Sequence, residues 1–549
     1  MASSLLPSRY YFLVACVLSC AGAVALALWL DQGLWWWPAA ATGALSVVGI
    51  RDVTQQRQAI RRNYPILSHI RFFLEYMRPE IRQYFLETEQ EQVPFSRAQR
   101  SIVYQRAKNQ VDKRPFGTLL DVYAPQYEWI NHSMAPRPIA DHDFRITIGN
   151  AACRQPYSAS VFNISAMSYG ALSPNAILAL NDGARRGRFF HDTGEGSISR
   201  FHREPGGDLA WELGSGYFGC RNPDGSFSAE RFRDNAASPQ VKLIEIKLSQ
   251  GAKPGHGGVL PGAKVTKEIA AARGVAIGED CVSPASHSAF STPVGLLEFV
   301  AQLRELSGGK PVGFKFAMGH PWEWFGIAKA MLKTGIVPDF IVVDGGEGGT
   351  GAAPLEFTDH VGAPLREGLA LVHNTLVGVG LRGQIRIGAS GKIVTAFDIA
   401  RSCAMGADWC NSARGFMFAL GCIQAQSCHT GLCPTGMTTQ DPGRYRALVV
   451  PDKAERVLQF HQNTLKALKE LLSAAGLSHT DQIGPEHIIR RVNSTEVRSL
   501  ATLYPWVKPG ALVDGVSEQP AFRYFWEQAT PDTFVAPPNV LALQTSKMR

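Results

Sequence analysis

Three cysteines close together in the sequence are the residues best suited to redox chemistry. Cys422, Cys428 and Cys433 are spaced C-x5-C-x4-C, and a proline follows the last one. Thiolates are the usual ligands of iron–sulfur clusters, and three of them suit a three-iron cluster, or a four-iron cluster with one other ligand. Three buried structural thiols are the alternative, because free cysteines favour protein cores. Zinc would need a fourth ligand, and His429 neighbours Cys428 too closely for easy tetrahedral geometry.

A glycine-rich stretch offers a place where the backbone can approach a ligand closely. Residues 344–354 read DGGEGGTGAAP and directly follow an apolar, strand-like run. A formal G-x-G-x-x-G pattern begins at Gly346, but Pro354 follows instead of the crossover helix of a dinucleotide-binding unit. A flavin or substrate loop fits this stretch better than a plain flexible turn. The residues expected to bind the ligand are Gly346, Gly348, Gly349 and Thr350.

Two later loops, GASG at 388–391 and NSARG at 411–415, end the seventh and eighth predicted strands. In eight-stranded α/β barrels a phosphate site is often built from these two loops. Backbone amides, hydroxyl groups and a guanidinium can together hold a phosphate dianion. The cofactor-binding candidates here are Gly388, Ser390, Gly391, Ser412 and Arg414.

Lys315 lies in the apolar strand-like run VGFKFAMG. Its ammonium must face a partner, because an unpaired buried charge is costly. The pyrimidine edge of a flavin is a suitable partner, since it accepts negative charge on reduction. An internal salt bridge is the alternative.

Strand-like and helix-like stretches alternate from about residue 155 to 420, which indicates an α/β fold. Eight strand–helix units predict a (β/α)8 TIM barrel, in which ligands bind at the C-terminal ends of the strands. The predicted strands are 161–168, 189–193, 243–248, 275–283, 312–317, 340–343, 385–387 and 408–411. The predicted helices include 264–273, 293–306, 324–333, 365–380 and 395–405.

The N-terminus carries two apolar runs separated by a short turn. Residues 10–30 contain no charge, and a helix of that length spans roughly 30 Å, the thickness of a bilayer core. Residues 34–50 open with three tryptophans, which suit a membrane interface. Arginines follow this run and predict a multi-pass cell-membrane protein whose catalytic domain is cytoplasmic. A cleaved signal peptide is the alternative, but it leaves the second run without a role.

The 549 residues, 45% hydrophobic and 19% charged, indicate a mostly globular chain. The net charge of +8 is accompanied by no nucleic-acid-binding pattern, so it suggests membrane-surface and anion binding. The ten cysteines do not resemble a disulfide framework, which indicates a reducing compartment. The predicted division is a transmembrane hairpin at 1–50, a helical linker region at 51–150, the barrel with the cysteine segment at 151–440 and a helical extension at 441–549. Further helices are predicted at 66–87 and 453–475.

Together these residues resemble the FMN-binding synthase domain of glutamate synthase. The matching stretches occur in the family's order and cover about residues 160–440. The resemblance implies FMN, a three-iron, four-sulfur cluster, and the reduction of 2-iminoglutarate, formed from 2-oxoglutarate and ammonia, to glutamate. The stretches are SAMSYGALS at 165–173, TGEG at 193–196, QGAKPG at 250–255, LPG at 260–262, GGTGA at 348–352 and the cysteine segment.

By the same resemblance, Glu195, Lys247 and Arg273 contact the substrate. The chemistry agrees, because two cationic side chains can bind the two carboxylates of a dicarboxylic acid. Glu195 can hold the imino nitrogen or relay a proton. The residues implied to lie near the flavin are Met167, Ser168, Lys253 and Lys315.

Some positions depart from the family pattern. Val259 stands where the family usually has glutamine, and His256 where an acid is usual, so the substrate could differ. Ala2 stands in place of the cysteine nucleophile of the family's glutaminase, so ammonia is expected from solution or from a separate subunit. No pyridine-nucleotide module is visible, so electrons are expected from a ferredoxin, a partner subunit or a membrane carrier.

The leading hypothesis is therefore a membrane-anchored, glutamate synthase-like oxidoreductase that acts on CH–NH2 groups. A second hypothesis keeps the same cofactors but gives them another imino- or amino-acid substrate, because of Val259. A third is an electron-relay membrane subunit without turnover, which the N-terminal apolar runs suggest.

Overall fold

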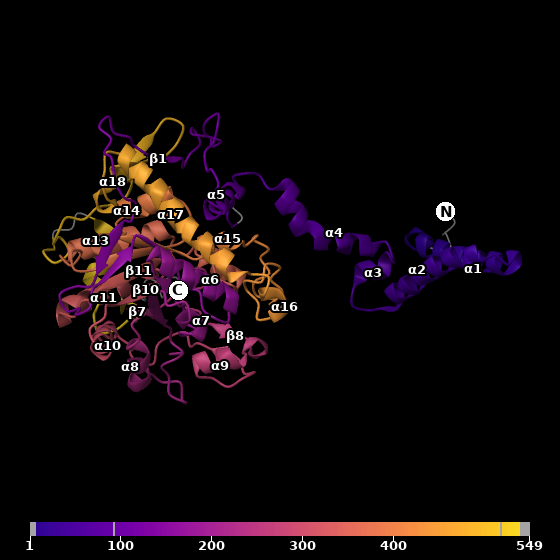
Figure 1. Ribbon diagram of the computed structural model, residues 1–549, viewed down its shortest axis with the longest axis horizontal. Helices are drawn as coiled ribbons and strands as arrows, with labels where there is room; N and C mark the ends of the chain where they lie inside the picture. The colour runs from indigo at the N-terminus through magenta and orange to yellow at the C-terminus, as the bar shows by residue number, and fades with distance from the viewer. Residues whose placement is uncertain (1–6, 92–93, 516–518, 539–549) are drawn as a thin grey trace, which may run out of the picture. The chain divides into compact units, whose positions relative to one another are not determined.

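The structure is a computed structural model that describes residues 7–91, 94–515 and 519–538. The chain divides into two compact units, Met1–Val93 and Pro94–Arg549, and each is described by itself (Figure 1).

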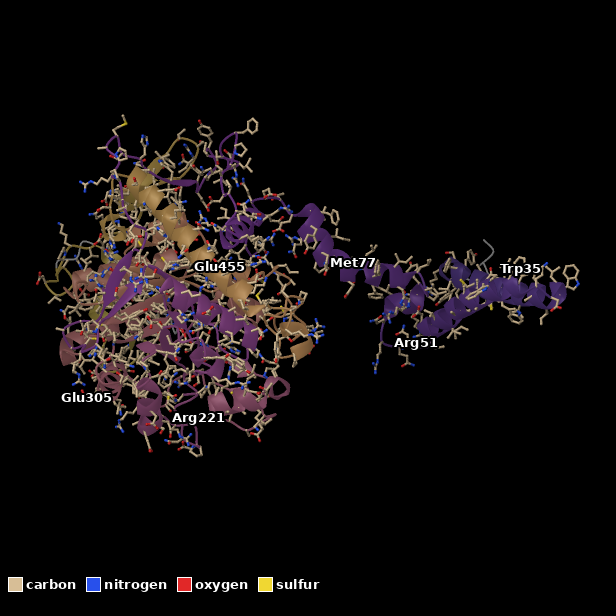
Figure 2. All side chains as sticks on the ribbon, viewed as in Figure 1. Trp35, Arg51, Met77, Arg221, Glu305 and Glu455 are labelled. Atoms are coloured by element: carbon tan, nitrogen blue, oxygen red, sulfur yellow. The ribbon has the colours of Figure 1, made fainter. Side chains whose placement is uncertain are left out.

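The first unit is helical. Helices α1 (Tyr11–Leu30) and α2 (Trp36–Thr54) pack against each other. Trp35 precedes α2 and Arg51 lies in its last turn (Figure 2). The remaining helices of this unit are α3 (Ala59–Asn63), α4 (Ser68–Ile81) and the π-helix Arg82–Leu86, with 3-10 turns at Ser8–Tyr10 and Gly33–Trp35. A helix is therefore present where residues 66–87 predicted one.

Within the described residues, one helix is long and apolar enough to cross a membrane, Ser8–Leu30. That finding rests on length and composition alone. Helix α2 is less apolar than α1, since it contains Arg51, Asp52 and small polar residues, and it is not among the membrane-span candidates. The prediction of two membrane spans is therefore not supported, and α1 is the remaining candidate.

The second unit is built on a closed barrel of eight parallel strands. Each strand pairs with the next in chain order, and β13 closes the barrel on β4. This confirms the predicted TIM barrel. The strands are β4 (Phe162–Ile164), β5 (His191–Asp192), β6 (Leu209–Leu213), β7 (Val241–Lys247), β10 (Val312–Phe316), β11 (Phe340–Asp344), β12 (Arg386–Ser390) and β13 (Trp409–Ser412).

One of the eight strand predictions was wrong. The run 275–283 is not a barrel strand, because Gly278 turns the chain at φ 78° and only β9 (Cys281–Val282) is extended. Strand β9 pairs antiparallel with β8 (Val259–Leu260) outside the barrel. The third barrel strand is β6, which the sequence analysis missed.

Helices follow the strands as expected, with bounds within three residues of the predicted ones. Helix α10 illustrates why its start could be predicted. Pro293 occupies its first turn, and the Thr292 hydroxyl caps it by accepting a hydrogen bond from the Gly295 amide. The helices of the barrel region are α6 (Pro174–Gly187), α7 (Arg200–Arg203), α8 (Ala229–Ala236), α9 (Lys267–Arg273), α10 (Pro293–Leu306), α11 (Pro321–Thr334), α12 (Leu355–His360), α13 (Leu365–Gly378), α14 (Ala396–Ala404) and α15 (Arg414–Leu420).

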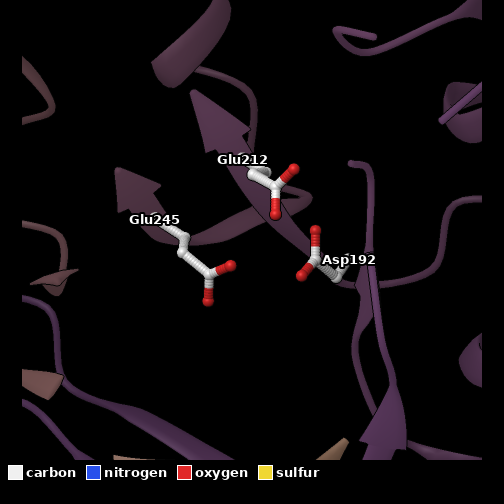
Figure 3. A group of neighbouring side chains, drawn as sticks. All are labelled: Asp192, Glu212 and Glu245. Atoms are coloured by element: carbon white, nitrogen blue, oxygen red, sulfur yellow. The ribbon is translucent and has the colours of Figure 1, made fainter. Parts of the chain in front are cut away.

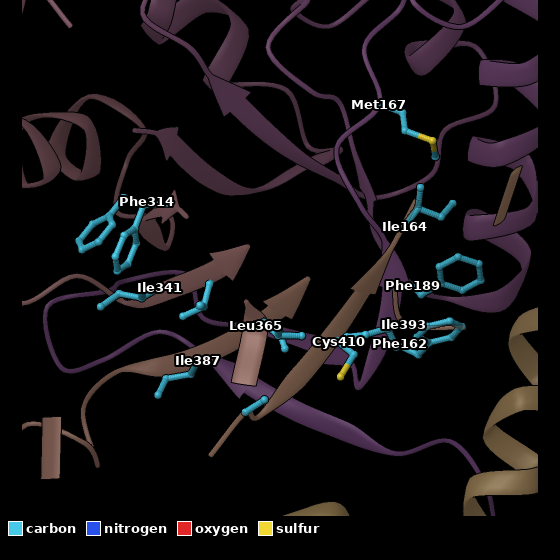
Figure 4. Close-up of a cluster of buried hydrophobic side chains, with 14 of the residues drawn as sticks. Phe162, Ile164, Met167, Phe189, Phe314, Ile341, Leu365, Ile387, Ile393 and Cys410 are labelled. Carbon is cyan, nitrogen blue, oxygen red and sulfur yellow. The ribbon is translucent and has the colours of Figure 1, made fainter. Parts of the chain in front are cut away.

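The core lies between the strands and the surrounding helices. Phe162, Phe314, Ile341 and Ile387 come from four different strands and are fully buried (Figure 4). Parallel strands covered on both faces are expected to be nearly continuous apolar runs, and these strands are. The charged residues inside them are therefore exceptions that require a reason.

Helix α17 (Val450–Ala474) matches the helix predicted at 453–475 and packs on α6 and on α5 (Arg97–Ala107). His461 of α17 stacks on Phe189 with a centroid distance of 3.9 Å. The division of the chain at residues 150 and 440 remains a prediction. The other described elements are β1 (Glu128–Ile130), β2 (Arg145–Ile148), β3 (Tyr157–Ser160), α16 (Pro442–Tyr445), β14 (Ile488–Arg491), β15 (Val497–Ser499), α18 (Leu500–Leu503), α19 (Pro520–Gln528) and 3-10 turns at Gly262–Lys264 and Thr480–Gln482.

Candidate active site

A cavity of about 380 Å³ lies at the C-terminal ends of the barrel strands. Its walls come from the segments after β4, β5, β7, β11, β12 and β13, where barrels of this kind hold their ligands. The volume is within the usual range for a small-molecule site.

The cavity is strongly basic. Seven basic and three acidic side chains line it, so it favours an anionic ligand. The basic residues are Lys247, Lys253, Lys264, Arg273, Lys315, Lys392 and Arg414, and the acidic ones are Glu195, Glu212 and Asp344.

Glu195 and Lys247 form an ion pair inside the cavity. Lys247 is the last residue of β7, and its Nζ lies 3.1 Å from Glu195 Oε2. Burial acts to raise the pKa of Glu195, but the nearby charges of Lys247 and Arg273 outweigh it and hold that pKa below the usual value. The carboxylate is therefore ionised near neutral pH and fixes the position of the ammonium.

Arg273 ends α9 and is 5% exposed. One of its terminal nitrogens donates to the Tyr169 carbonyl at 3.2 Å, and its guanidinium lies 5.1 Å from the Phe218 ring centroid. Its Nε has no hydrogen-bond partner among the described residues. Arg273 also lines the cavity, so its guanidinium can bind an anionic ligand there.

The glycine-rich loop after β11 reaches the cavity in part. Gly348, Gly349 and Thr350 line it, and Arg414 Nη2 donates to the Thr350 carbonyl at 2.7 Å. Gly346 does not line the cavity, because its amide donates to the Ala363 carbonyl at 2.8 Å and faces the protein interior.

The loops after β12 and β13 meet at the same cavity. Ser390, Gly391, Ser412 and Arg414 line it, and Gly391 adopts a φ of 154°. Gly388 does not reach the cavity, because it lies within β12, where a side chain would collide with Trp409.

The other residues expected near the flavin also line the cavity: Met167, Ser168, Lys253 and Lys315. Burial lowers the pKa of Lys253 from its usual value. Lys315 has the internal salt bridges that were the alternative interpretation, to Glu212 and, at 3.2 Å, to Glu245.

Sequence reasoning missed three carboxylates on neighbouring barrel strands. Asp192, Glu212 and Glu245 point toward one another, and an oxygen of each lies within 4.8 Å of the others (Figure 3). A sequence signal for two of them existed. Glu212 and Glu245 are charged residues within apolar strands, which is the feature that singled out Lys315.

The cysteine segment follows α15 directly. Cys428 lines the cavity, whereas Cys422 and Cys433 do not, and all three thiols are free. Burial acts to raise the pKa of Cys433, but hydrogen bonds with Thr435 and Thr438 lower it to about 7. Among the residues searched, the three sulfur atoms do not gather within 4.8 Å, as ligands of a single zinc ion would. Sulfur atoms bound to different irons of one cluster can lie farther apart.

The fold and the cavity thus define a barrel enzyme with a basic, anion-binding site. The family described as "Conserved region in glutamate synthase" matches residues 134–478. The glutamate synthase large subunit-like protein YerD of Bacillus subtilis is 37% identical over 495 residues, which are 83% of this chain and 94% of that protein. The chain therefore belongs to the glutamate synthase family, whose members are oxidoreductases acting on CH–NH2 groups.

The archaeal glutamate synthase [NADPH] of Methanocaldococcus jannaschii is 38% identical over 321 residues. This match covers 58% of the present chain and 60% of that enzyme, so the chain spans less than two thirds of such relatives. Among solved structures, a mandelate oxidase matches with a TM-score of 0.38 at 15% identity, over 73% of this chain and 92% of that one. This last likeness adds nothing to the assignment.

Proposed function

We propose that the protein reduces 2-iminoglutarate, formed in the cavity from 2-oxoglutarate and ammonia, to glutamate. The observation that carries the proposal is the basic cavity in which the Glu195–Lys247 pair and Arg273 line the same space. A dicarboxylic acid supplies the two negative charges that such a set of cations binds.

FMN fits the residues present, and two features support it. Gly391 has a backbone conformation that residues with side chains rarely adopt, and a Cβ there would lie 3.3 Å from Leu365, so the glycine lets the loop after β12 pack closely where it lines the cavity. Arg414 and Ser390 line the cavity and would hold the phosphate, whereas the hydroxyl of Ser412, which also lines it, donates to the Ile393 carbonyl at 2.5 Å. Lys253 and Lys315 would lie by the ring, and the bound FMN would supply hydride chemistry.

The protein's own residues would bind and orient the substrate. Lys247 and Arg273 would each hold a carboxylate, and Glu195, kept ionised by Lys247, would accept a hydrogen bond from the imino nitrogen. The position of Lys247 at the end of a barrel strand gives its ammonium a rigid base, which favours precise orientation.

An iron–sulfur cluster held by Cys422, Cys428 and Cys433 is part of the proposal. Three free thiols within one segment beside the cavity fit it, and the lowered pKa of Cys433 favours the thiolate that binds iron. Iron and sulfide analysis of anaerobically purified protein tests this, and a three-iron, four-sulfur cluster is expected.

The function is tested by reducing the purified protein anaerobically and adding 2-oxoglutarate with ammonia. The expected result is flavin reoxidation with glutamate formation, which neither compound alone supports. Reduced protein that forms no glutamate under these conditions would refute the proposal.

A second candidate substrate class is favoured by Val259. This residue lines the cavity, is 56% exposed and cannot hydrogen-bond a carboxylate. An apolar 2-oxo acid would suit it better than 2-oxoglutarate. A screen of 2-oxo acids with ammonia decides, and V259Q should shift the preference toward 2-oxoglutarate.

Electrons would come from a donor protein or a membrane carrier, and ammonia from solution or a separate subunit. Archaeal and archaeal-type relatives carry NADPH in their names, so NADPH is the electron donor to compare with reduced ferredoxin. Flavin reduction by NADPH alone would exclude the need for a donor protein.

Membrane attachment through α1 is also part of the proposal. The apolar Ser8–Leu30 helix supports it. Arg9 and the arginines at 51, 57, 61 and 62 lie at the same end of the α1–α2 pair, which favours a cytoplasmic location for that end and for the barrel that follows. The full chain should sediment with membranes and resist extraction by high salt. Recovery of the intact, uncleaved chain in the soluble fraction would contradict the proposal.

A further inference from the structure

Three carboxyl groups and one ammonium meet at the wall of the cavity. Asp192 of β5, Glu212 of β6 and Glu245 of β7 converge, and Lys315 of β10 is paired with Glu212 and Glu245 (Figure 3). Glu212 and Lys315 line the cavity, whereas Asp192 and Glu245 lie behind them. All four are at most 3% exposed.

The charges of this cluster do not balance. The other charged groups that face it are Lys247 of β7 and Asp344 of β11. Lys247 is paired with Glu195, so Lys315 alone would have to balance three carboxylates. An uncompensated buried charge is costly, and a buried carboxyl group avoids the cost by taking a proton.

A bound metal ion is not needed to neutralise these carboxylates. The ammonium of Lys315 already pairs with two of the three carboxylates, so a cation of the protein itself occupies that role. Glu245 Oε1 is buried and accepts no hydrogen bond from the described residues apart from the ion pair with Lys315. This oxygen therefore has room for a proton of its own.

We propose that Asp192 and Glu245 share one proton, which passes to Lys315 during turnover, so that the cluster is a proton relay opening on the cavity. This rests on the proposed function. The assignment agrees with electrostatics, because burial and then Asp192 raise the pKa of Glu245 well above its usual value, and burial also raises that of Asp192. Glu212 stays ionised as the counterion of Lys315.

The relay step balances without an added reactant. A bond between Nζ of Lys315 and hydrogen breaks as the proton passes to a nitrogen or oxygen atom of the substrate. The Glu245 proton then crosses 3.2 Å to Nζ and leaves a carboxylate. A proton from water entering the cavity returns the cluster to its resting state. In this role Glu245 is a positioning residue, because it acts through Lys315.

The first test is infrared spectroscopy of the resting, full-length protein, which needs no turnover. The carbonyl stretch of a protonated, buried carboxyl group is expected. E245Q and D192N should each lose this band. In each variant the new amide is the uncharged group of the Asp192–Glu245 pair, so the remaining carboxyl group ionises. E298Q, at an exposed glutamate of α10, is the matched control and should keep it. Absence of the band from the native protein, or its persistence in both cluster variants, overturns the proposal.

The second test separates the relay from a structural role. In E245Q, the Tm and flavin content should match the native protein, because glutamine has the size and charge of the protonated acid. Turnover should fall about 100-fold, because Lys315 can no longer regain its proton from Glu245. The curve of turnover against pH should no longer show the step that the ionisation of the cluster causes in the native protein. Native turnover in E245Q, or a turnover loss matched by loss of flavin, overturns the relay. If the native protein forms no glutamate at all, the proposed function fails while the infrared result still stands.

Discussion

Replacing Gly251 by alanine should damage the site without touching a charged residue. A Cβ at this position would lie 2.0 Å from the Gly345 carbonyl oxygen, whereas such contacts essentially never fall below 3.0 Å. The obstacle is backbone, so the glycine-rich loop after β11 must move by about 1 Å, and a displacement of that size can cost about 100-fold in rate. Overpacking should also lower the free energy of unfolding by about 1–3 kcal/mol.

The assay for G251A is kcat and KM for glutamate formation, together with flavin content and Tm. G383A is the matched control, because a Cβ there has no atom within 4 Å. We expect kcat to fall about 100-fold in G251A, with the protein still folded, and to stay native in G383A. Native kcat and flavin content in G251A would show that the loop does not position the reacting groups.

Other substitutions test single interactions. K247M removes one contact to a substrate carboxylate, and a hydrogen bond to a charged group is worth about 1.5–3 kcal/mol. KM for the 2-oxo acid should therefore rise about 10- to 150-fold. An unchanged KM would contradict the role of Lys247. C433S should lose iron while keeping flavin. C403S, at a buried cysteine outside the cysteine segment, is the control and should keep both. A native iron content in C433S would show that Cys433 is not an iron ligand. Because the folded-state pKa of Glu195 is below the ordinary 4.5, its pairing contributes stability that is present above that pH and lost as the pH falls through the lower folded value. The Tm of E195Q should therefore lack this acid-side loss below the ordinary pKa of 4.5. Curves of Tm against pH with identical shape for E195Q and the native protein would contradict the role of this pair.

The barrel was predictable because most of its strands are short apolar runs followed by amphipathic helices. Strand β6, LAWEL, was missed because the charged Glu212 interrupts its apolar pattern. The run 275–283 was mistaken for a strand because it begins with the apolar residues VAI and contains CV near its end, although Gly278 turns the chain. Both errors have one cause: strand pairing depends on partners far away in the sequence.

Most of the site followed from residue types and resemblance, and the three-dimensional structure brought Glu195, Lys247 and Arg273 to one cavity. Gly346 and Gly388 do not reach it, because a glycine pattern does not reveal which glycines face a ligand and which allow close packing. The convergence of Asp192 with two glutamates could not be read from the sequence, since strand register sets which side chains share a level of the barrel.

The ribbon formed by β8 and β9 has a consequence for how this enzyme could change. Val259, Arg273 and Cys281 all belong to one excursion between β7 and α10, outside the barrel ladder. Lys247 and Lys315 instead belong to barrel strands. Under the proposed function, exchanging the excursion would change the contacts of Val259 and Arg273 with the substrate without moving the lysines on the barrel strands. Grafting the excursion from a relative is therefore expected to transfer that relative's substrate preference.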